Sequence, residues 1–227
     1  YQTWHVGKWH LGRESHSPER HGFEVNIAGR HCGHPPGPNG FWGPYNIPDF
    51  TGPPGEYLTD RLTDEATRLI ESRDPHKPFF LNLWHYAVHT PIQAPADLVE
   101  KYRRKARRLG LDRIDPMLRG EPIPMQYPPG QTPRHVVRRT VQSDPVYAAM
   151  IENLDANIGR LVDTLERLGL SRETVILFTS DNGGLSTAEG APTCNHPLAE
   201  GKGWTYEGGN RVCQFITWPG TITAGRT

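Results

Sequence analysis

Apolar and polar positions along the chain form blocks that predict both strands and helices. Three compact runs, rich in β-branched and aromatic residues and bounded by Pro, Ser, Asp or Gly, are typical of buried strands; they are Phe79–Tyr86, Thr174–Thr179 and Cys213–Trp218. Thr3–Val6 has a similar strand-like pattern. Apolar side chains recur at helical spacing over Tyr57–Arg73 and Val146–Leu168, so each of these segments is predicted to be a helix with one buried face.

The second helix has suitable residues at both ends. Asp144 can cap its N-terminus, Pro145 suits the first helical position and Gly169 can end it. Together with a further helix in the basic segment near residue 105, the order helix, strand, helix, helix, strand, strand indicates an α/β sheet with long insertions.

Three irregular stretches separate these elements. His31–Pro54 is dense in Gly and Pro and is expected to shape a ligand pocket, Arg119–Pro133 is expected to be a surface excursion, and Leu185–Arg211 follows a strand and is rich in Gly. In open α/β sheets, ligands bind on loops beyond the carboxyl ends of the strands. The loops are therefore where we look for chemistry.

Composition and charge exclude several functional classes. The chain has 227 residues, with 25 Lys and Arg balanced by 25 Asp and Glu, so no global field favours nucleic acid or a membrane surface. Its 24 Gly and 22 Pro suggest long ordered loops over a modest core, and three cysteines are too few for a disulfide framework. No apolar run is as long as a membrane span. Neither end resembles a natural terminus, and we expect a segment truncated at both ends.

One helix carries a basic cluster. It consists of Arg103, Arg104, Lys105, Arg107 and Arg108. The interpretation favoured from the sequence is a solvated helix end balanced by nearby acids; the alternative is a surface that attracts a polyanion such as a sulfated polysaccharide.

Two segments in the first half of the chain carry groups suited to acid–base chemistry. In Gly7–Gly12, Lys8 and His10 would alternate onto one face just past a strand, where they could bind an anion and move a proton, although such a pair is also common on inert strands. In His85–Pro91, the proline and the strand pattern argue against a helical zinc site. A histidine at a strand end suits a general acid or base; a structural histidine is the alternative.

Two segments in the second half offer metal ligands and a cation. Asp181 and Asn182 follow a strand, and the two glycines after them permit a tight turn that aims hard oxygen ligands inward; an ordinary Asp-Asn-Gly turn is the alternative. Lys202 lies between glycines, so its ammonium could approach a ligand closely, unless the segment is simply a mobile loop.

Taken in order, GKWHLG, HYAVHTP, SDNGG and GKGWTYEGG resemble the sulfatase family, and NLDANIGRL fits the helix that precedes the SDNG strand of that family. The wording GFEVNIAG and HYAVHTPIQAP is similar to bacterial enzymes that act on sulfated carbohydrates. The resemblance implies an alkaline-phosphatase-like α/β sandwich, a mixed, mostly parallel sheet covered by helices on both faces. Residues 1–227 would be the central part of one catalytic domain in a periplasmic or secreted enzyme. Its partner would be a sulfated carbohydrate or an aryl sulfate, with no nucleic acid and no membrane span.

The resemblance also implies roles for six residues. Asp181 and Asn182 would bind one calcium ion, and Lys8 would hold the nucleophile and a sulfate oxygen. His10 would take a proton to expel sulfate from the covalent intermediate, while His89, the preferred proton donor, and Lys202 would face the leaving oxygen. The family nucleophile is a formylglycine made from Cys or Ser in a C/S-x-P-x-R segment. No cysteine here has that context, so the nucleophile is expected upstream of this sequence.

Two features bear on the alternatives. Relatives usually have Pro where this chain has Cys213, which we interpret as a buried packing thiol because it lies in an apolar run. A phosphatase or phosphonate ester hydrolase of the same superfamily usually has His at the position of Asn182, and imidazole suits zinc whereas amide oxygen suits calcium. A non-catalytic glycan-binding relative is the other alternative, and the presence of all six residues argues against it.

Overall fold

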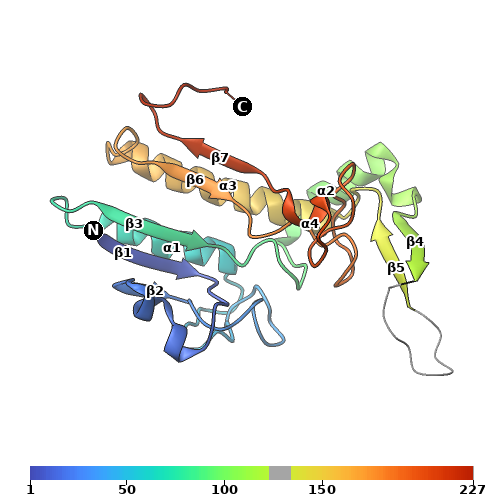
Figure 1. Cartoon of the computed structure of the whole chain (residues 1–227), viewed down its shortest axis with the longest axis horizontal. Helices are drawn as coiled ribbons and strands as arrows, with labels where there is room; N and C mark the ends of the chain where they lie inside the picture. The colour runs from blue at the N-terminus through green and yellow to red at the C-terminus, as the bar shows by residue number, and fades with distance from the viewer. Residues whose placement is uncertain (123–133, 227) are drawn as a thin grey trace. The chain divides into compact units, whose positions relative to one another are not determined.

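The computed structural model (Figure 1) describes residues 1–122 and 134–226. The chain divides into two compact units. Unit 1 comprises Tyr1–Lys101 and Val146–Thr174, and unit 2 comprises Tyr102–Pro145 and Val175–Thr227. The long helix α2 (Ala96–Leu109) passes from the first unit into the second. No helix among the described residues is long and apolar enough to cross a membrane.

Unit 1 is built on a parallel sheet of three strands. These are β1 (Gln2–Gly7), β2 (Val25–Ile27) and β3 (Phe79–Trp84), in the spatial order β2-β1-β3. Trp4 pairs with Val25 on one side and with Leu81 on the other. Because all three strands run the same way, their carboxyl ends share one edge, and the Lys8–His10 and His85–His89 segments both begin at that edge.

Two helices complete unit 1. The predicted helices are confirmed as α1 (Leu58–Glu71), which packs on β1 and β3, and α3 (Pro145–Arg167). The apolar face of α1 is buried, as its spacing predicts; its residues are Leu58, Leu62, Ala66, Leu69 and Ile70. The two helices are joined by amides of α3: Asn153 and Asn157 donate from Nδ2 to Oδ1 of Asp60 over 2.9 and 2.7 Å.

The boundaries of α3 match those expected from its sequence. Pro145 is its first residue, and Gly169, in the left-handed region at φ 71°, follows its last turn. The amide of Leu170 donates to the carbonyl of Leu165 over 2.8 Å, which satisfies a terminal carbonyl of the helix. Capping by Asp144 stays a prediction.

The described part of unit 2 contains two antiparallel strand pairs. β4 (Met117–Pro122) pairs with β5 (His135–Arg139), and β6 (Ile176–Thr179) pairs with β7 (Gln214–Thr217). The single-turn helix α4 (Glu207–Asn210) lies in the glycine-rich segment before β7. The segment Arg119–Pro133 was expected to be an irregular excursion over the surface. Its first part is not irregular, because it belongs to strand β4, but it does lie mostly at the surface; residues 123–133 lie outside the described residues.

The predicted burial of β6 and β7 is also wrong. Leu177, Phe215 and Ile216 are 57%, 63% and 54% exposed, and Cys213, interpreted from the sequence as a buried thiol, is exposed as well. The strands do form, but β6 and β7 pair with each other alone within the described part of the chain. An apolar run predicts a strand through its own residues, whereas burial also needs a covering layer.

Candidate active site

The strand β1 ends in a turn that only glycine permits. Gly7 lies at φ 104°, and a Cβ there would overlap the carbonyl oxygen of Trp84 at the end of β3. The amide of Lys8 donates to that same carbonyl over 2.7 Å. The backbone of Lys8 is therefore tied to the edge of the sheet where β1 and β3 end.

His10 departs from the geometry expected of it. Its backbone lies at φ 55°, so the chain after Gly7 is not an extended strand and the predicted alternation of Lys8 and His10 does not hold. The amide of His10 donates to the carbonyl of Arg30 over 3.2 Å, and its side chain is exposed. The conformation of this turn, rather than strand alternation, determines the position of the imidazole.

A second pair of histidines, His31 and His34, lies beside His10 and His89. The ring of His31 lies 5.5 Å from that of His10, and the ring of His34 stacks 6.3 Å from that of His89. A Cβ on Gly33 would lie 2.6 Å from Cε1 of His10, so this glycine makes room for the imidazole. The sequence predicted only that the segment His31–Pro54 shapes a pocket. The signal for these two residues is the pair of histidines that flanks Cys-Gly in HCGH.

His89 itself is held by its own turn. Its amide donates to the carbonyl of Tyr86 over 2.9 Å, and Nδ1 lies 3.1 Å from the carbonyl oxygen and 3.2 Å from the hydroxyl of Thr90. A carbonyl accepts only, so Nδ1 carries the proton in that contact. The predicted loop after β3 is confirmed, and no helix forms here.

Two further histidines lie beneath this edge of the sheet. His5 is fully buried, its ring packs edge-on against Trp9 and Trp84, and burial lowers its pKa to about 4. Its Nε2 lies 3.2 Å from the carbonyl of Gly7, which makes the neutral ring a donor that supports the turn. Burial likewise lowers the pKa of His85 to about 4, and neither ring nitrogen has a hydrogen-bond partner among the described residues.

In unit 2, the Asp181–Asn182 turn follows β6 directly, as predicted. The amide of Gly183 donates to the carbonyl of Gly209 over 2.9 Å, and a Cβ on Gly183 would overlap the carbonyl oxygen of Gly208. The turn thus docks on α4 through a backbone hydrogen bond. Asp181 is exposed and Asn182 half-buried.

The loop that carries Lys202 is bonded to the same turn. The amide of Lys202 donates to the carbonyl of Gly184 over 3.1 Å. Nδ2 of Asn195 donates to that carbonyl over 2.8 Å and to the carbonyl of Glu200 over 2.9 Å, which also accepts from Ser186 Oγ over 2.7 Å. The loop is therefore not merely a mobile glycine segment. Sequence reasoning missed Asn195, because nothing in its immediate sequence distinguishes it from a surface amide.

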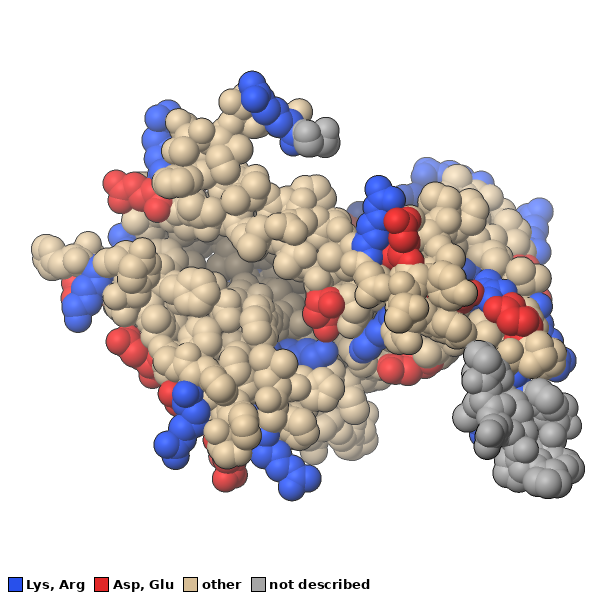
Figure 2. Space-filling model, in the orientation of Figure 1, with Lys and Arg blue, Asp and Glu red and all other residues tan. Residues whose placement is uncertain are grey.

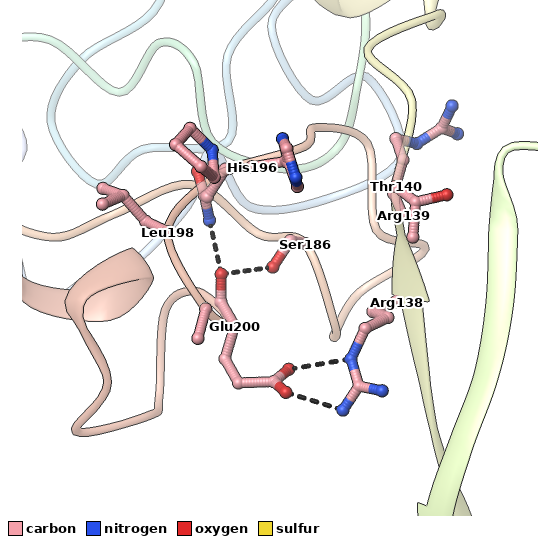
Figure 3. Close-up of a pocket in the computed structure, with 10 residues that line it drawn as sticks. Arg138, Arg139, Thr140, Ser186, His196, Leu198 and Glu200 are labelled. Carbon is pink, nitrogen blue, oxygen red and sulfur yellow. Dashed lines mark hydrogen bonds and ion pairs between the residues drawn. The ribbon is translucent and has the colours of Figure 1, made fainter.

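A cavity adjoins this loop (Figure 3). It is lined by Arg138, Arg139, Thr140, Ser186 and residues 195–200. The guanidinium of Arg138 pairs with the carboxylate of Glu200 at 2.6 Å, and this pairing raises the pKa of Arg138 further above its usual value. Neither Asp181 nor Lys202 lines the cavity, so the predicted residues do not converge on it.

Asp181 and Asn182 fit a hard cation by chemistry but supply few ligands. A carboxylate and an amide oxygen are what calcium prefers, and calcium takes six to eight oxygen ligands. No cluster of three or more His, Cys, Asp or Glu suited to a metal occurs in the part of the chain that the structure describes. By themselves, these two residues would supply only part of such a shell.

The sequence profile of the sulfatase family matches residues 1–227, the whole chain. This chain belongs to the sulfatase family. It is 30% identical to Arylsulfatase J of Mus musculus over 239 residues, which cover 96% of the chain and 32% of that protein. It is 28% identical over 248 residues to N-acetylgalactosamine-6-sulfatase of Mus musculus, covering 97% of the chain and 38% of that protein.

Solved structures confirm the fold expected for a sulfatase. The chain superposes on the crystal structure of Ps i-CgsB in complex with k-i-k-neocarrahexaose with a TM-score of 0.67 and 25% identity, covering 99% of this chain and 46% of that one. The predicted alkaline-phosphatase-like α/β class is thereby confirmed. The chain spans about a third of the length of the curated relatives that it matches.

Proposed function

We propose that this sulfatase chain functions in the hydrolysis of sulfate esters of a carbohydrate. Its family membership supports ester hydrolysis. The sugar derivatives named with two similar proteins, N-acetylgalactosamine-6-sulfatase and the complex with k-i-k-neocarrahexaose, support a carbohydrate substrate. The proposal extends to a secreted or periplasmic location, in line with the enzymes that its motifs resemble.

The residues of unit 1 handle an anion and protons. The ammonium of Lys8 binds a sulfate oxygen, because its backbone is tied to the edge of the sheet and its charge opposes the charge of the ester. His89 gives its proton to the departing sugar oxygen, and the contact of Nδ1 with Thr90 leaves Nε2 as the atom that does so. His10 removes a proton in the later step that releases sulfate.

The residues of unit 2 hold positive charge for the same reaction. Asp181 and Asn182 would hold part of the coordination shell of a calcium ion, which would supply positive charge beside the sulfate group. Lys202 binds the ester oxygen that becomes the leaving group. The formylglycine nucleophile of the family would supply the covalent step.

The observation that most supports the proposal is the carbonyl of Gly184, which accepts two hydrogen bonds. A single carbonyl receives the amide of Lys202 and the side chain of Asn195, and it lies two residues beyond the Asp181–Asn182 turn. The cation and the hard oxygen ligands are therefore parts of one bonded structure. Such fixed charges stabilise a transition state because they do not reorganise as charge develops.

Sulfate release by the complete enzyme tests the proposal. We expect Asp181→Ala to lower kcat/KM on a sulfated monosaccharide at least about a hundredfold, because a methyl group cannot replace a carboxylate ligand, and to raise the calcium concentration needed for half activity. The matched control is Asp163→Ala, an exposed carboxylate on α3, which should leave both quantities unchanged. Cleavage of phosphate esters in place of sulfate esters, with chelators having no effect, would instead favour a phosphatase.

A further inference from the structure

The charge of this neutral chain is divided unequally between its two units. Unit 1 contains 12 Lys and Arg against 17 Asp and Glu, whereas unit 2 contains 13 against 8, so their formal net charges are −5 and +5. The global balance of 25 against 25 conceals this division. A local basic field on unit 2 is therefore compatible with a neutral protein.

Much of that basic charge lies on α2. The five cations of its C-terminal half are all exposed and are here called the α2 basic surface: Arg103, Arg104, Lys105, Arg107 and Arg108. Figure 2 shows basic side chains, in blue, on the surface of unit 2. Arg103 and Arg107 are four residues apart, as are Arg104 and Arg108. The two residues of each pair therefore lie on one side of the helix, with about 5–6 Å between their Cβ atoms.

Other helices of this protein use arginine differently. On α1, Arg61 pairs with Glu65 at 3.0 Å, and on α3, Arg167 pairs with Glu71 of α1 at 2.5 Å. On α2, Arg103 and Arg108 have no acidic partner among the described residues. The expectation from the sequence that nearby acids balance this helix end therefore fails for these two side chains.

Helix stability does not account for the cluster. Cations stabilise the C-terminus of a helix, but the effect is confined to the last turn. Arg103 and Arg104 lie nearer the middle of Ala96–Leu109. Like charges at a spacing of four residues repel each other and do not stabilise a helix. The two arginine pairs are suited instead to binding anions.

We propose that the α2 basic surface binds the sulfate groups of a polysulfated carbohydrate chain, which makes it a docking site for a polymeric substrate. The choice of ligand rests on the proposed function. Guanidinium groups form paired hydrogen bonds with tetrahedral oxyanions and lose little hydration energy on doing so. Proteins that bind single-stranded nucleic acid usually also offer aromatic side chains on which bases stack. The aromatic ring of Tyr102 on this helix already has Nζ of Lys105 over it, 5.5 Å from the ring centroid, which favours a sulfated carbohydrate over nucleic acid as the ligand.

Binding of labelled dextran sulfate to the complete protein tests the docking site. In Arg103→Gln/Arg108→Gln we expect at least a tenfold weaker Kd, with a shallower dependence of log Kd on log[NaCl], because fewer ions are displaced. The matched control is Arg20→Gln/Arg226→Gln, which removes two exposed arginines elsewhere and should bind as the unaltered protein does. Uncharged dextran should not bind.

Kinetics separate this docking site from the catalytic proposal. The α2 variant should keep its kcat/KM on a sulfated monosaccharide while its KM for a sulfated polysaccharide rises. If the protein cleaves no sulfate ester but dextran sulfate binding still requires Arg103 and Arg108, the docking site stands and the proposed function fails. If catalysis is normal and both double variants bind dextran sulfate equally, the docking site is refuted. Tighter binding of single-stranded DNA than of dextran sulfate, lost in the α2 variant, would also overturn it.

Discussion

Replacing Asn195 measures how firmly the Lys202 loop is held to the Asp181–Asn182 turn. Asn195→Ala removes hydrogen bonds of 2.8 and 2.9 Å to the carbonyls of Gly184 and Glu200. Each bond contributes about 0.5–1.5 kcal/mol net. Both carbonyls keep another donor, the amide of Lys202 and the hydroxyl of Ser186 respectively, so neither is left unsatisfied. We therefore expect a loss near the lower end of the summed range, about 1–2 kcal/mol in local opening free energy.

Hydrogen–deuterium exchange measures this loss directly. The amide of Lys202 is protected by its bond to Gly184, so a peptide that contains it should exchange about 5 to 30 times faster in the variant. Asn195→Asp should cost more than the alanine variant, because a carboxylate oxygen would oppose two carbonyl oxygens at these distances. In the complete enzyme, kcat should fall with exchange protection, since a less ordered Lys202 stabilises the departing oxygen less well.

The matched control is Asn210→Ala in the same unit. Asn210 is exposed and donates over 3.2 Å to the carbonyl of Tyr206 and over 3.5 Å to the carbonyl of Trp204, and neither of these carbonyls accepts the amide of Lys202. Its loss should leave the exchange of Lys202 unchanged. Equal protection of that amide in the unaltered chain and in Asn195→Ala would refute the reasoning, because it would show that the glycine backbone alone holds the loop.

Four further predictions concern unit 1. Gly7→Ala should lower the free energy of unfolding by about 1–3 kcal/mol more than Gly22→Ala in urea titrations, since both lie at positive φ but only at Gly7 would the new methyl overlap a carbonyl; equal losses would contradict this. His5 is neutral when folded, with a pKa of about 4 against 6.5 unfolded, so below pH 6.5 the unfolded state binds the extra proton and stability falls until about pH 4. His5→Gln should remove about 3 kcal/mol of that pH-dependent loss, as measured by unfolding at pH 7 and pH 4, and an unchanged pH profile would show that His5 does not titrate in this way. In the complete enzyme, His89→Ala should slow cleavage of a sugar sulfate about a hundredfold to ten-thousandfold while hardly affecting nitrophenyl sulfate, whose alcohol departs without help. His10→Ala should stop after one turnover on both substrates, and equal losses on the two substrates for His89→Ala would remove it from the leaving-group position.

Local features of this protein followed from its sequence because they depend on neighbouring residues. The periodic apolar face of α1 is buried as predicted, and Gly169 ends α3 because glycine adopts the left-handed conformation without strain. The turn of Asp181 and Asn182 at the end of β6 was visible for the same reason. The family too could be predicted, since its motifs are short segments whose order survives in the sequence.

What needed the tertiary structure were contacts between segments far apart in the chain. The bond of Asn195 to Gly184, the approach of His34 to His89 and the pairing of β4 with β5 leave no periodic trace in the sequence. Burial of β6 and β7 was mispredicted because an apolar strand records its own residues but not the layer that covers it. The unequal charge of the two units also became visible only with the structure. The net charge of zero is a sum over the whole chain, whereas a ligand meets only the charges that the fold brings to one surface.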